Sequence, residues 1–149
     1  MSGLEPIAAL GLACNIFQII SFGREIITVA KQVYQNGSGY GDSSLKNRAD
    51  CMHDIASAIE KEYTPSSAGT FQPAKARRLR QISQKCCAAA RSLQEEVDFI
   101  IKNARTGSLR SAVKVAAKAN WRKRRLERLE KELNDCEGLM QFGLLDYIW

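Results

Sequence analysis

A chain of 149 residues is long enough to bury one substantial hydrophobic core without metals or disulfides, so we expect a single domain. The composition, with 45% hydrophobic residues, 26% charged residues and only three prolines, is that of a globular protein and excludes extended disorder. The net charge of +6 is unevenly divided: residues 1–63 hold five Lys and Arg against seven Asp and Glu, and residues 64–149 hold seventeen against nine. This basic second half suits an anionic partner such as phospholipid or nucleic acid, and the charge count alone names neither.

The first predicted helix is long and unusually apolar. Apolar residues at steps of three and four follow Pro6, a first-turn residue, and continue to Asn36, with one gap around Gly23 where the helix can kink. From Ile7 to Phe22 they occupy nearly every face. That stretch is shorter than the roughly 20 apolar residues that span a bilayer, and Glu5 precedes it instead of a basic residue. We therefore expect neither a constitutive transmembrane helix nor a secretory signal.

Three further helical stretches follow. After a Gly/Ser loop, the spacing predicts a second helix over 45–63, and Pro73 opens a strongly amphipathic third helix that runs past Ile100. Beyond Gly107 comes a small-residue segment, Leu109 to Asn120, and a final amphipathic helix that begins near Trp121. No useful β-alternation appears. The sequence thus predicts an all-α, antiparallel bundle of four to five helices with a long apolar N-terminal helix, the last element being divided near Asn120.

The sequence contains few groups that enzymes use. The single histidine, His53, has no nucleophile-base pair, metal-ligand array or phosphate loop with it, so we expect no catalysis, no cofactor and no metal. Cys51 and His53 are two residues apart, and such residues do not share a helix face. The five cysteines lie within apolar helical patterns, which predicts reduced core residues in a cytosolic protein.

Two segments are candidate functional sites. The first is the apolar start of helix one, as a helix that binds a membrane or a partner. Its candidate residues are Leu4, Ile7, Leu10, Leu12, Ile16, Phe17, Ile19, Ile20 and Phe22. The second is a basic run on the last helix, as a patch for an anionic surface. Its residues are Arg122, Lys123, Arg124, Arg125 and Arg128.

Two stretches of the chain are similar to a known family. The segment from Glu5 to Gly23, EPIAALGLACNIFQIISFG, resembles the opening of N-terminal helical domains on fungal STAND (NLR-like) proteins, and the segment WRKRRLERLEKEL from Trp121 to Leu133 resembles their late region. The resemblance implies a signalling or effector domain over 1–149, placed before a nucleotide-binding oligomerisation module and related to HeLo-like cell-death domains. It also implies that an N-terminal apolar helix reaches membranes after oligomerisation.

Three functions remain open at this point. The leading hypothesis is a cytoplasmic, non-enzymatic domain in programmed cell death or incompatibility, which forms homo-oligomers on activation and then associates with anionic membranes through helix one. The second is an adaptor that binds another signalling protein, with helix one permanently buried. The third is nucleic-acid binding through the basic last helix, which we expect least because alternating Glu and Arg are typical of a solvated helix face.

Overall fold

Long runs of helix-forming residues with apolar positions every three or four residues produce an all-helical chain. The computed structural model describes residues 6–36, 42–62, 74–105 and 116–148, and every one of them is helical. The helices are α1 (Pro6–Asn36), α2 (Asp42–Glu62), α3 (Ala74–Arg105) and α5 (Ala116–Ile148). Within these ranges there is no strand, so the predicted all-α fold is confirmed.

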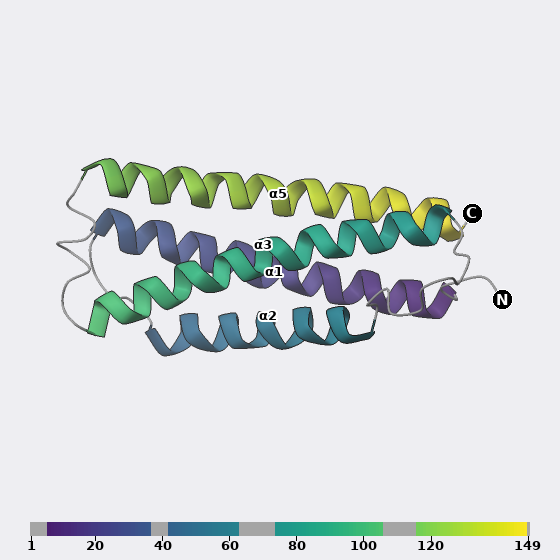
Figure 1. Ribbon diagram of the computed structural model, residues 1–149, viewed down its shortest axis with the longest axis horizontal. Helices are drawn as coiled ribbons and strands as arrows, with labels where there is room; N and C mark the ends of the chain where they lie inside the picture. The colour runs from purple at the N-terminus through teal and green to yellow at the C-terminus, as the bar shows by residue number, and fades with distance from the viewer. Residues whose placement is uncertain (1–5, 37–41, 63–73, 106–115, 149) are drawn as a thin grey trace.

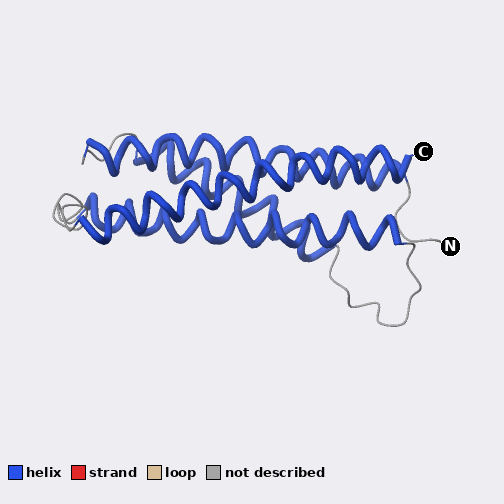
Figure 2. The backbone as a smooth tube through the Cα atoms, turned by 90° about the horizontal axis from the view of Figure 1, so that it is seen from above, coloured by secondary structure: helices blue, strands red, loops and turns tan. Residues whose placement is uncertain are grey.

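The four helices lie alongside one another, each antiparallel to the one before it (Figure 1). α1 and α3 each pack against the three other helices, and α2 and α5 lie on opposite sides of this central pair. The view from above shows the same elongated bundle (Figure 2). One end of the bundle therefore holds the start of α1, the start of α3 and the end of α5, and the opposite end holds the start of α5.

The core runs the length of the bundle and draws on all four helices. Its largest fully buried side chains are Leu12, Ile16, Ile19, Ile20, Ile26, Ile27, Leu45, Met52, Leu79, Leu93, Ile100 and Leu126. Gly23 lies within this core: a Cβ there would stand 2.6 Å from Leu133 Cδ1 and 3.2 Å from Leu93 Cδ1. The glycine thus lets α3 and α5 pack directly on the α1 backbone, and α1 continues through it as one helix.

Two predictions from the sequence were wrong, one on a division of the last helix and one on the burial of the cysteines. α5 is continuous from Ala116 through Asn120, with no division there, because an interior Asn costs a helix only a few tenths of a kcal/mol and the apolar pattern beyond it continues. Of the five cysteines predicted to lie in the core, Cys14 and Cys51 are exposed, since both fall on outward helix faces. The predicted segment 109–115 lies outside the described residues.

Candidate functional site

The apolar start of α1 is split between core and surface. Leu12, Ile16, Ile19 and Ile20 are at most 1% exposed, and Phe17 and Phe22 are half-buried against the core. Ile7 and Leu10 point outward, with 81% and 45% of their surfaces exposed. Leu4 lies outside the described residues. Of the eight candidate residues that the structure describes, Ile7 and Leu10 are therefore the two that are exposed to a partner in the folded bundle.

Beyond its first turns, the solvent-exposed side of α1 is polar. Its exposed positions from Gln18 onward recur at helical spacing and include Ser21, Glu25, Thr28 and Gln32. Within the predicted apolar stretch, Ile7 to Phe22, Gln18 and Ser21 are exposed, and three neighbouring helices pack against α1. α1 is consequently an amphipathic core helix with an apolar tip.

By length and composition alone, one window of α1 is long and apolar enough to cross a membrane. This apolar segment extends over Ile7–Val33, 27 residues. It is longer than the predicted apolar stretch, Ile7 to Phe22, which was too short to span a bilayer. Core helices of soluble proteins and N-terminal signal sequences can have the same length and composition. The window is compatible with membrane association, and its buried residues show that in this fold it serves as core.

Exposed large hydrophobic side chains gather at one end of the bundle. Ile7 and Leu10 of α1 lie at the end where α5 finishes, and α5 exposes Leu139, Phe142 and Leu145 in its last third (Figure 1). Among the described residues only one other large hydrophobic side chain, Trp121, is exposed. We use the name apolar end for Ile7, Leu10, Leu139, Phe142 and Leu145, without Trp121. Such clustering is unusual for a soluble monomer and typical of an interaction surface.

The basic patch on α5 is partly used within the molecule. Arg122 Nη1 and Arg125 Nη1 donate to Glu96 Oε1 over 3.0 and 2.8 Å, and Glu96, from α3, is fully buried. Arg125 Nη2 also donates to Glu95 Oε2 over 2.8 Å. Burial alone lowers the Arg125 pKa, but the hydrogen bonds and charges of Glu95 and Glu96 outweigh it, so the pKa is raised.

The aromatic ring of Phe99 completes this cluster, because the Arg122 guanidinium lies 3.3 Å from the ring centroid. Lys123, Arg124 and Arg128 remain exposed. Three of the five predicted cations are thus presented to solvent, while Arg122 and Arg125 join α5 to α3.

The two predicted sites do not come together. α1 begins at one end of the bundle and the basic patch lies near the start of α5, at the other end (Figure 1). Arg77 and Arg78 are exposed in the first turns of α3, which begins at the same end of the bundle as α1, and Arg78 Nη1 pairs with Asp146 Oδ2 over 3.4 Å. The two arginines were not predicted as site residues from the sequence, although the run from Lys75 to Arg80 holds four basic residues.

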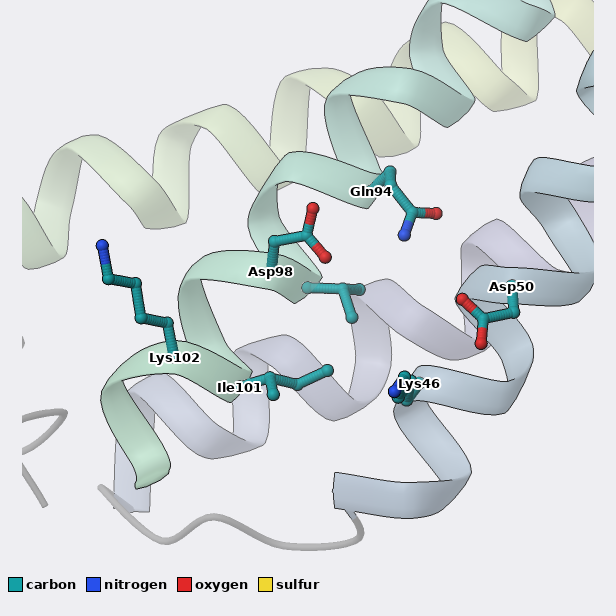
Figure 3. Close-up of a pocket in the computed structure, with 7 residues that line it drawn as sticks. Lys46, Asp50, Gln94, Asp98, Ile101 and Lys102 are labelled. Carbon is teal, nitrogen blue, oxygen red and sulfur yellow. The ribbon is translucent and has the colours of Figure 1, made fainter. Parts of the chain in front are cut away.

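A groove of about 410 Å³ lies between α2 and α3. Figure 3 shows the carboxylates of Asp50 and Asp98 on its two sides, with Lys102 extending away. Gln94 Oε1 is buried beside it, without a hydrogen-bond partner among the described residues. The described residues that line this groove include no Ser, Thr, Cys or His. No group of three potential metal ligands occurs within the described parts of the chain.

Two of the three buried thiols, Cys86 and Cys87, are poor nucleophiles, whereas the hydrogen bond with Cys86 lowers the pKa of Cys136. A hydrogen bond to Cys136, together with burial, raises the pKa of Cys86 well above its usual value, and burial raises the pKa of Cys87 to about 11. Both remain protonated at neutral pH, and the thiolate is the reactive form. These cysteines therefore act as small core residues.

No family model, curated protein or solved structure matches this chain.

Proposed function

We propose that this chain is a non-enzymatic, cytoplasmic signalling or effector domain of a fungal NLR-like protein, which oligomerises on activation and then binds anionic membranes in programmed cell death or incompatibility. The observation that carries the membrane step is the exposure of Ile7 and Leu10 at the tip of α1, at the same end of the bundle as the exposed Arg77 and Arg78. An apolar tip beside cations suits the surface of an anionic bilayer.

Energetics favour docking by this tip over release of the whole helix. Withdrawing α1 from the bundle would uncover six large, fully buried Leu and Ile side chains, each worth about 1.5–3 kcal/mol. The total, on the order of 10 kcal/mol, is as large as the whole stability of an ordinary domain. Ile7 and Leu10 are already exposed, so their insertion leaves the bundle intact. Deeper insertion of α1 requires the energy of oligomerisation or of an activating partner.

The decisive experiment is co-sedimentation with phosphatidylserine-containing vesicles at low salt. The double substitution Ile7→Asp and Leu10→Asp should weaken binding at least tenfold, because two apolar anchors are removed and two negative charges are added. Trp121→Asp is the matched control, since it also replaces an exposed hydrophobic residue but at the opposite end. Circular dichroism should show that all variants keep wild-type helicity.

A charge-reversal pair tests the electrostatic half of the proposal. Arg77→Glu with Arg78→Glu should reduce vesicle binding strongly, and Arg124→Glu with Arg128→Glu should reduce it less, because the second pair lies far from the tip. Equal loss from both pairs, or binding unaffected by the tip variant, would count against docking by α1.

A second candidate function is favoured by the burial of Leu12, Ile16, Ile19 and Ile20. It is an adaptor that binds another signalling protein with α1 permanently in the core. Wild-type protein that ignores anionic vesicles at every salt concentration would favour this function over the first.

A further inference from the structure

The last third of α5 carries an apolar strip on the side that faces away from the core. Leu139, Phe142 and Leu145 are 47%, 77% and 56% exposed and are spaced three residues apart, so they form one contiguous row, here named the α5 ridge. Met140 and Gly143, between them, face inward and are buried. A single exposed Leu is ordinary on a protein surface. Three large exposed hydrophobic side chains in one row are typical of a binding surface.

We propose that the α5 ridge is a self-association surface, on which α5 of a second copy packs antiparallel. The ridge is symmetric about Phe142, with one Leu three residues before it and one three residues after. A two-fold rotation therefore sets Phe142 against its own counterpart and Leu139 against Leu145 of the second copy, in both directions. Such self-complementarity is what an isologous dimer interface requires.

The charges around the ridge also fit a second copy. Asp146 is half-exposed at the Leu145 end, where its Oδ2 accepts from Arg78 Nη1 of α3 over 3.4 Å. Lys85 is exposed on α3 at the Leu139 end, next to Cys86, which contacts Cys136 of α5. Antiparallel pairing about Phe142 brings Asp146 of each copy toward Lys85 of the other. Asp135, exposed on α5 before the ridge, would instead be repelled by an anionic lipid surface, which favours protein over membrane as the partner of the ridge.

Gly138 provides room for close packing beside the ridge. It lies one residue before Leu139, and a Cβ built on it meets nothing within 4 Å. A facing helix can therefore approach the α5 backbone at this point, as small residues allow between packed helices.

The size of the ridge sets the strength of the association. Three side chains per copy bury far less than the roughly 800 Å² per partner of a stable complex. The dimer is accordingly weak and forms when copies are concentrated. The inference thus rests on the oligomerisation step of the proposed function and names its surface.

Sedimentation equilibrium of the full 149-residue chain tests the inference, from about 10 µM to about 1 mM, where weak complexes associate. The wild type should shift toward dimer, and Phe142→Glu should weaken dimerisation at least tenfold. Gly138→Arg keeps all three apolar side chains but fills the approach space, and should have the same effect. Trp121→Glu, a matched loss of an exposed hydrophobic residue on the same helix, should leave the dimer unchanged.

Cysteine cross-linking tests the register. In a background with the exposed Cys14 and Cys51 changed to Ser, Phe142→Cys should form a disulfide between two copies when a mild oxidant accepts the two thiol electrons and protons. Leu139→Cys should cross-link efficiently to Leu145→Cys in a mixture of the two variants and poorly to itself.

A wild type that stays monomeric at about 1 mM, or a dimer that survives Phe142→Glu, would overturn the inference. So would loss of vesicle binding in ridge variants of a monomeric protein, which would assign the ridge to lipid. Self-association is measured without lipid, and vesicle binding is measured on the tip variant of α1. Failure of this inference is therefore distinguishable from failure of the proposed membrane function.

Discussion

The two ends of the bundle differ in whether their side chains have partners within the molecule. At the end where α5 begins, the buried carboxylate of Glu96 is paired with Arg122 and Arg125, and the Phe99 ring covers Arg122. At the end where α5 finishes, Ile7 and Phe142 are 81% and 77% exposed. At the first end, here called the charged end, the buried charge is paired within the molecule. At the apolar end, large hydrophobic side chains are exposed and can contact a partner.

This difference shows that a basic run in sequence is a poor guide to a basic binding surface. Two of the five cations in the run hold helices together, because a buried carboxylate must be paired to be tolerated. The apolar side chains at the other end have no such internal role, which is why the proposals above place both the membrane and the second copy there.

The largest expected effect is the loss of stability when a charge replaces a buried residue of α1, compared with an exposed residue at its tip. Ile16→Asp places an unpaired charge at a position with 0% exposure and should cost more than about 4 kcal/mol, enough to unfold the domain. Ile7→Asp, at 81% exposure, should change the free energy of unfolding by less than about 0.5 kcal/mol. Urea unfolding followed by circular dichroism measures both.

Similar stabilities for these two variants would contradict the arrangement of α1. Helicity retained by Ile16→Asp would show that the segment around Ile16 leaves the core easily. That result would revive release of the whole helix as the membrane step.

Local signals explain how much of the fold was predictable. The bounds of α1 follow from Pro6 at its start and Asn36 before a glycine, and both were predicted from sequence. The division at Asn120 was wrong because a weak helix former does not stop a helix whose apolar pattern continues into Leu126.

The candidate site was less predictable, since it depends on which helices are neighbours. Periodicity marks the apolar faces of α1 but does not reveal that three helices cover them and leave only the tip exposed. Likewise the sequence gives no sign that Glu96 of α3 pairs with Arg122 of α5, 26 residues away. Phe142 and Leu145 fall outside the buried pattern that includes Met140, but periodicity alone does not show how far they are exposed.

An intermediate effect is expected at the charged end. Glu96→Gln removes the buried charge that neutralises Arg122 and Arg125, whose side chains are only 20% and 16% exposed, and should destabilise the bundle by about 2–4 kcal/mol. Glu95→Gln, at a side chain 70% exposed, is the matched control and should cost less than about 0.5 kcal/mol. Thermal unfolding compares them, and equal losses would show that the cluster is no more than a surface network.

The smallest effect concerns the ion pair of Glu60 on α2 with Arg91 on α3, which contrasts with the buried cluster because both side chains are more than 40% exposed. Arg91 Nε donates to Glu60 Oε1 over 2.9 Å, and this hydrogen bond is the main reason that the Glu60 pKa is lowered. A carboxyl with a lowered pKa in the folded state stabilises the fold above its unfolded pKa, and that contribution disappears as the pH falls through the folded value.

Glu60→Gln should therefore cost less than about 1 kcal/mol at neutral pH, because solvent and salt screen an exposed pair. The difference from wild type should vanish in acid, below the folded pKa of Glu60, where the native carboxyl is protonated as well. Urea unfolding at neutral and acidic pH measures this, with the exposed Glu127→Gln on α5 as the control. A difference that persists in acid would mean that Glu60 acts by packing, and that α2 is held to α3 by apolar contacts without help from this charge.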